Sequence, residues 1–212
     1  MQPDFASVKP KLRGVLHQVS FFVSLVTGPL LVALSQAGTR GATAIYSASV
    51  SLLFGISALY HRPNWGPAVR KWLGKLDHTA IFVLIAGTFT PFAIVIGTTW
   101  AWTMLVVVWC GALLGVCLQL LPLSMPKPVV VIPYLALGWM GISLIPPAFT
   151  TLGPGPPLLL AAGGALYTLG AIAYAKRAPN PRPGVFGYHE VFHALVVVAA
   201  YLHYAAVAVA VS

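Results

Sequence analysis

Long apolar runs separated by short polar stretches dominate this sequence. A helix needs about 20 apolar residues to cross the hydrocarbon core of a bilayer. Breaking the chain at its charges, prolines and glycine clusters gives seven such runs, near 17–36, 42–60, 78–97, 100–121, 129–146, 158–175 and 188–210. The pattern predicts an all-α, polytopic membrane protein whose residues 1–212 form one seven-helix domain.

The twelve Lys and Arg residues are distributed unevenly between the connections of these runs. Eleven lie before the first run or in the second, fourth and sixth connections, and only Arg40 lies elsewhere. Because cytoplasmic connections carry the excess of positive charge, we expect a cytoplasmic N-terminus and an external C-terminus. The expected location is the cell membrane, crossed several times.

The first run has an alternative interpretation as a signal peptide. It follows three basic residues and ends near Ser35-Gln36-Ala37, which imitates a cleavage site. Cleavage would remove His17 and leave six spans. The charge distribution is equally consistent with an uncleaved first helix, which is the interpretation we adopt.

Composition excludes a soluble protein. The chain is 58% hydrophobic and 7% charged, against about 25% charged in soluble domains. A net charge of +9 is typical of proteins that meet nucleic acid or an anionic membrane surface. Because the chain is so hydrophobic, we expect membrane lipids as partners and no nucleic acid. The two cysteines, Cys110 and Cys117, are too far apart on one helix for a disulfide, and we expect both to be buried. The oligomeric state stays open.

The acids and histidines of the spans are the most informative positions, because polar groups at membrane depth are usually placed for function. Asp77 and Glu190 are the only acids beyond the N-terminal tail, and each opens a predicted span at the cytoplasmic side. His61 closes the second span at the same side, while His189 and His193 flank Glu190. Groups far apart in the sequence are therefore expected at one membrane depth.

This spacing predicts a zinc site. His189 and His193 are four residues apart, so they project from nearly the same face of a helix, about 6 Å apart along its axis. A catalytic zinc has three protein ligands and an open position for water, and His61 is the natural third ligand. We therefore expect Zn²⁺ bound by His61, His189 and His193, although iron or manganese is not excluded.

Two further residues are candidate catalytic groups. Asp77 is placed to orient or deprotonate a water molecule, and Ser57 lies one turn from His61 on the same helix face. The alternative for Asp77 is a helix N-cap that interacts with the helix dipole.

The remaining histidines have simpler interpretations. We expect His78 to bond to a backbone group or lie at the headgroup level, and His17 to have an interfacial role. His203 lies about 15 Å along the helix from His193, which is too far to share its metal, so we expect it to form a hydrogen bond between helices.

Residues 189–193 also match the H-E-x-x-H pattern of metalloproteases, in which the glutamate is the general base. No third ligand follows on the same helix, so such an enzyme would also need His61. Glu190 stays open as an alternative base.

With these residues in place, the chain resembles the haemolysin III branch of the progestin and adiponectin receptor family. The resemblance rests on four stretches, which are Arg13-Gly14-Val15-Leu16-His17, Ser57-Ala58-Leu59-Tyr60-His61, Leu76-Asp77-His78-Thr79 running on to Phe92, and Gly187-Tyr188-His189-Glu190-Val191-Phe192-His193. It implies seven helices and a zinc near the cytoplasmic leaflet. The ligands would be His61, His189 and His193, with Asp77 holding water and Ser57 as the matching hydroxyl.

The resemblance also bears on activity. Eukaryotic receptors of this family are linked to hydrolysis of lipid amides, and bacterial members carry the haemolysin name for reported lytic or pore-forming behaviour. The short N-terminal tail and the Asp77-His78 pair, where many receptors have Asp-Tyr, argue against a hormone receptor. We expect a zinc-dependent hydrolase of a lipid amide or ester. The alternative is a lytic, pore-forming or regulatory membrane protein in which zinc is structural.

Overall fold

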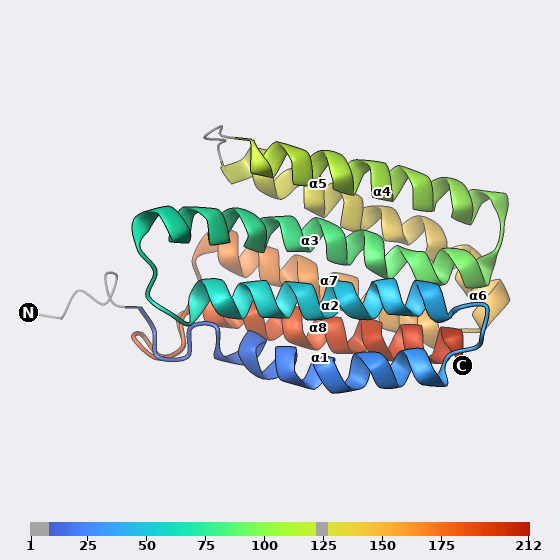
Figure 1. The fold of residues 1–212 in the computed structure, drawn as a ribbon, viewed down its shortest axis with the longest axis horizontal. Coiled ribbons are helices and arrows are strands. Elements are labelled where there is room, and N and C mark those ends of the chain that lie inside the picture. Colours follow the sequence, from blue (N-terminus) through green and yellow to red (C-terminus); the bar gives the residue numbers. More distant parts are fainter. Residues whose placement is uncertain (1–8, 122–126) are drawn as a thin grey trace, which may run out of the picture.

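The protein is a bundle of long α-helices that run side by side along one axis (Figure 1). A computed structural model describes residues 9–121 and 127–212. Its elements are α1 Val15–Leu34, α2 Arg40–His61, α3 Pro67–Ile96, α4 Thr99–Leu120, α5 Lys127–Trp139, the 3₁₀ helix η1 Met140–Leu144, α6 Ile145–Leu152, α7 Gly155–Lys176 and α8 Tyr188–Val211. Among the described residues there is no strand, only an isolated bridge between Arg182 and Phe186.

Seven helical segments in the described part of the chain are long and apolar enough to cross a membrane. Six are single helices, and the seventh runs over Ile132–Leu152 through α5, η1 and α6. Large apolar side chains such as Phe22, Val26 and Leu114 face outward, as expected of surfaces in contact with lipid. The seven predicted spans and the multi-pass membrane class are confirmed.

Two spans differ from their predicted bounds by more than three residues. The third begins at Pro67, with Gly66 as its N-cap, so Arg70, Lys71 and Lys75 lie on the helix rather than in a loop. Proline at the first helical position starts a helix readily, but hydropathy detects only the apolar part that follows. At 30 residues, α3 is about 45 Å long and exceeds a hydrocarbon core of about 30 Å.

The fifth span extends to Leu152 rather than to 146 and is interrupted by η1. Pro146 and Pro147 occupy the first turn of α6. Proline has no backbone N–H to continue the hydrogen bonding of a preceding α-helix. A turn of tighter 3₁₀ helix therefore joins α5 to α6.

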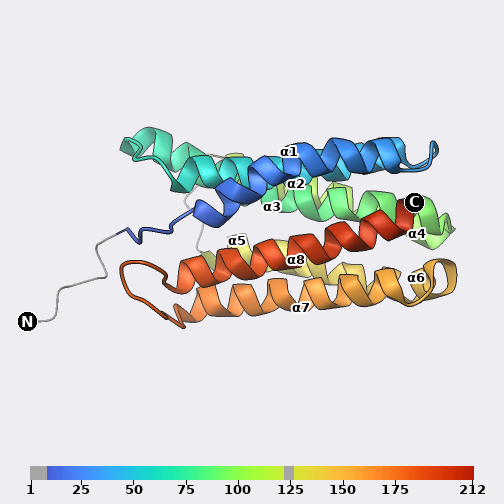
Figure 2. The same ribbon diagram turned by 90° about the horizontal axis from the view of Figure 1, so that it is seen from below.

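Each helix packs mainly on its sequence neighbours, and α8 closes the bundle against α7, α1 and α3 (Figure 2). The core between them contains Tyr46, Phe54, Phe82 and Phe92, each at most 2% exposed. Cys110 and Cys117 lie on the outer face of α4 and are exposed, so the expectation that they are buried is wrong. The surrounding lipid is as apolar as a protein core, so an apolar run does not reveal which of its faces points inward.

The two ends of the bundle differ in charge. The start of α1 and the α2–α3 and α7–α8 connections share one end (Figure 1), which we call the basic end. Every Lys and Arg except Arg40 belongs to segments at this end, and Arg40 begins α2 at the other. The charge separation predicted from the sequence is thus a separation between the two ends of the bundle.

Candidate metal centre

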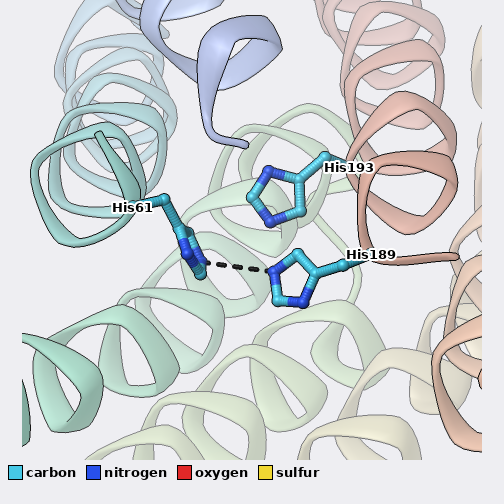
Figure 3. Close-up of side chains that lie close together, drawn as sticks. All are labelled: His61, His189 and His193. Atoms are coloured by element: carbon cyan, nitrogen blue, oxygen red, sulfur yellow. Dashed lines mark hydrogen bonds between the residues drawn. The ribbon is translucent and has the colours of Figure 1, made fainter. Parts of the chain in front are cut away.

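Three imidazoles meet inside the basic end of the bundle (Figure 3). His61 is the last residue of α2, and His189 and His193 lie on successive turns at the start of α8. Their candidate ligand nitrogens all lie within 4.8 Å of one another. His61 is 6% exposed and His193 is 3% exposed. His61 and His189 are 128 residues apart in the sequence. Two helices distant in sequence therefore supply one compact cluster.

The spacing of these nitrogens suits a small metal ion. Ligand nitrogens of a tetrahedral zinc, each about 2.0 Å from the ion, lie about 3.3 Å from one another. The Nε2 atoms of His61 and His189 are 3.4 Å apart (Figure 3). His193 has a buried Nδ1 without a hydrogen-bond partner among the described residues. Three imidazoles in this arrangement could hold a metal ion.

Asp77 lies beside this cluster. The Oδ2 atom of Asp77 lies 3.6 Å from Nε2 of His61, and the Asp77 side chain is 19% exposed. Asp77 is ten residues inside α3, so the N-cap interpretation is wrong. Ser57 is buried one turn before His61 on α2. The carboxylate therefore reaches His61 from a third helix, and its side chain stays partly exposed.

A fourth histidine, His17, is more buried than the sequence predicts. His17 on α1 is 3% exposed, so the expected interfacial role is wrong. Its ring stacks on that of His193, with centroids 3.9 Å apart, and makes an edge-type contact with the ring of Phe54. Neither ring nitrogen has a partner among the described residues. His17 therefore forms the α1 wall of the cluster and fixes the plane of the His193 ring.

Two histidines have structural partners instead. Nδ1 of His78 lies 2.7 Å from the carbonyl oxygen of Gly74, one turn earlier on α3. Nε2 of His203 lies 3.2 Å from the carbonyl oxygen of Leu160 and so links α8 to α7. Both arrangements agree with the simpler interpretations of these residues.

Glu190 is held by protein groups on both carboxylate oxygens. Its Oε1 pairs with Arg13, and its Oε2 accepts a hydrogen bond of 2.8 Å from the backbone N–H of Gly187. The second contact caps the start of α8. Glu190 is 2% exposed, and its contacts join the segment before α1 to α8. This weighs against Glu190 as the general base of an H-E-x-x-H site.

The segment before α1 crosses the basic end and bonds to the α7–α8 connection and to the residue after α2. The backbone N–H groups of Lys11 and Leu12 donate to carbonyls of the α7–α8 connection, at 3.1 and 3.2 Å. The ammonium of Lys9 donates to the carbonyl of Arg62 at 2.9 Å. Partial burial, then the neighbouring Arg70, Arg62 and Arg13 charges, lower the pKa of Lys9.

Gly14 is a site residue that sequence reasoning did not single out. Its φ is +77°, and a Cβ added there would lie 2.7 Å from Cβ of His61. A side chain would therefore strain the backbone and displace the imidazole. The Arg13-Gly14 pair beside His17 was the available signal, but only the packing on α2 explains the glycine.

Comparison with known proteins identifies the family. The family model described as Haemolysin-III related matches residues 5–204. The chain belongs to the haemolysin-III-related family. Hemolysin-3 of Bacillus cereus is 36% identical over 150 residues, which cover 68% of this chain and 68% of that protein. A Hemolysin-3 homolog of Bacillus subtilis (strain 168) is 33% identical over 154 residues, covering 72% of this chain and 68% of the relative.

The matched region of this haemolysin-III-related protein runs from before His17 to beyond His203 and so includes the whole cluster. Both named relatives are bacterial. Together with the seven apolar segments, the match identifies a multi-pass membrane protein of a family with bacterial members.

In this haemolysin-III-related protein, Glu190→Gln is expected to lower thermal stability while leaving metal content unchanged. The amide cannot balance the charge of Arg13, and a charge-assisted hydrogen bond contributes about 1.5–3 kcal/mol to stability. Melting temperatures in detergent and metal analysis of the same samples measure both effects. Arg13→Gln should destabilise similarly, and the double variant should lose less than the sum of the two because they share one interaction. An unchanged melting temperature would contradict this role, and additive losses would show that the pair is not coupled.

Proposed function

We propose that this protein is a zinc-dependent membrane hydrolase that cleaves a lipid amide or ester. His61, His189 and His193 would hold the zinc. The observation that carries the proposal is that three imidazoles from two helices lie within 4.8 Å of one another beside a partly exposed carboxylate at one end of the bundle. Zinc held by these residues would lower the pKa of a water molecule toward neutrality and polarise a carbonyl oxygen.

Asp77 supplies the proton-accepting group. Its side chain is 19% exposed, and its carboxylate lies 3.6 Å from the His61 ring nitrogen. There it accepts a hydrogen bond from water, orients it, and takes up its proton as the carbonyl is attacked. Ser57, buried on the same face of α2 as His61, is a hydroxyl that can donate to the substrate or to an imidazole.

The surroundings of His189 favour a lipid. Its ring contacts those of Tyr174 and Phe192, with centroids 5.3 and 6.2 Å away, and Tyr188 lies at 6.3 Å. Such walls bind apolar chains, while the hydroxyls of tyrosine tolerate the membrane interface. A lipid whose amide or ester lies at headgroup level would therefore present its carbonyl at the depth of the histidines.

The same proposal places this site at the cytoplasmic leaflet. The basic end carries eleven of the twelve Lys and Arg residues, which supports a cytoplasmic N-terminus and an external C-terminus. The cell membrane is then the source of the substrate.

A panel of lipid amides and esters, offered to purified protein in liposomes, tests the function. We expect turnover of at least one class that stops when zinc is removed and returns when zinc is restored. Turnover that is indifferent to chelation, or no turnover with zinc bound, would overturn the proposal.

The names of the two relatives favour a second candidate, a lytic or pore-forming protein with structural zinc. It predicts dye release from the same liposomes without lipid cleavage. Release that persists after zinc removal would support it against the hydrolase.

A further inference from the structure

A long groove lies between α1 and α2 on the outer side of the bundle, away from the metal centre. Its volume is about 750 Å³. Small side chains make its floor, and its lining residues Ala33, Ala44 and Ala48 are exposed. The two helices lie side by side at one margin of the bundle, with α7 on the opposite side (Figure 2). The groove therefore opens toward lipid.

The serine hydroxyls along the groove are satisfied within the protein. The hydroxyl of Ser24 donates to the carbonyl of Phe21 at 2.7 Å and lies 2.9 Å from that of Ser51. The hydroxyl of Ser47 donates to the carbonyl of Gly28 at 3.4 Å. What remains for an occupant is mainly hydrocarbon, so the groove suits an apolar chain.

The length of the groove matches one leaflet. It runs along α2 from Arg40 to Ser51, and this stretch of helix rises about 16 Å. Half of a hydrocarbon core of about 30 Å is nearly the same length. One acyl chain of a lipid therefore fits between the headgroup layer and the middle of the bilayer.

Arg40 gives the groove a charged end. It is exposed, and it is the one Lys or Arg of the chain that does not belong to the basic end. Its Nε donates to the carbonyl of Ser35 at 3.3 Å, and the guanidinium has further N–H donors that match the oxygens of a phosphodiester. An anionic headgroup complements this charge best, since a zwitterionic headgroup carries its own cation.

A second copy of the chain is a poorer occupant. A two-fold axis along the membrane normal would place the same patch of both copies face to face. The two Arg40 side chains would then meet at the same membrane depth. No acidic residue lines the groove of either copy to balance their charges. Like charges in contact are unfavourable.

We propose that this groove binds a phospholipid with an anionic headgroup, with one acyl chain between α1 and α2 and the phosphate on Arg40. The site lies at the opposite end of the bundle from the histidines. It is independent of the proposed hydrolase activity.

Native mass spectrometry of the purified protein, supplied with phosphatidylglycerol and phosphatidylcholine of the same chain length, tests the site. The wild type should retain phosphatidylglycerol preferentially. Arg40→Gln should reduce this preference about fivefold, the value for one basic residue near a membrane surface, whereas Arg40→Lys should keep most of it. Arg62→Gln, at the basic end, is the matched charge control and should leave the preference intact.

A second pair of variants tests the groove itself. Ala44→Leu fills it and should lower retention of both lipids, whereas Ala162→Leu adds the same bulk to an exposed position on α7 and should not. Equal retention in Arg40→Gln and wild type would overturn the headgroup contact. Unchanged lipid retention in Ala44→Leu would overturn the groove as the binding site. A wild-type dimer that Ala44→Leu dissociates would also overturn it, because the occupant would then be a second copy of the chain.

Discussion

His193→Ala is expected to abolish zinc binding. Wild-type protein purified without chelator should contain about one zinc per chain, as expected for a three-histidine site. The variant should contain almost none. Removing a residue that only hydrogen-bonds to a zinc ligand weakens zinc binding by about 10–100-fold. Removing one of the three ligands themselves should weaken zinc binding by more. His193 is buried within the cluster, and without it only His61 and His189 of the three-histidine set remain to hold the metal. Metal analysis by mass spectrometry, with zinc competition against a chromogenic chelator, measures both content and affinity.

His203→Ala is the matched control, because it removes a partly buried histidine from the same helix. That histidine bonds to a backbone carbonyl instead. It should retain zinc. Since His193 also packs on His17, His193→Gln, which keeps much of the side-chain volume, separates loss of a ligand from loss of folding. Zinc retained by a folded His193→Gln or His193→Ala variant would remove His193 from the ligand set.

Asp77→Asn is expected to lower the rate of lipid hydrolysis by about 10²–10⁴-fold, the usual contribution of a general base. Zinc content should not change, because the three histidines supply the ligands. The amide is nearly the same size as the carboxylate but cannot take up a proton. Single-turnover rates with the lipid class identified by the panel, measured beside zinc content, separate chemistry from binding.

His78→Gln is the neighbouring control, since His78 faces the backbone of its own helix. It should keep most of the activity. Loss of zinc in Asp77→Asn would show that the carboxylate supports the metal rather than the water. Full activity in that variant would exclude Asp77 as the base.

Much of the fold could be predicted from the sequence because membrane spans obey a length rule. A run of about 20 apolar residues has few alternatives to a helix in lipid, and the part of the chain that the structure describes contains seven such segments. The rule says less about helix ends. It did not detect the polar start of α3 at Pro67 or the break at η1, because these depend on proline and on capping rather than on hydropathy.

The candidate site was predictable to a different degree for each residue. The four-residue spacing of His189 and His193 places both on one helix face in any helical structure. His61 required a second helix, and the positions of the span ends, together with the family motifs, pointed to it. Nothing in the spacing of His17 indicated that its ring would stack on His193 at 3.9 Å.

The sequence by itself determined the number of spans, the charge difference between their ends and the histidine pair on the last helix, since each follows from local composition or helical periodicity. Only the tertiary structure decided which apolar faces turn inward, because lipid and protein core are equally apolar. Packing buried His17, left Cys110 exposed and brought Asp77 to His61. The groove between α1 and α2 likewise exists only through the packing of two helices.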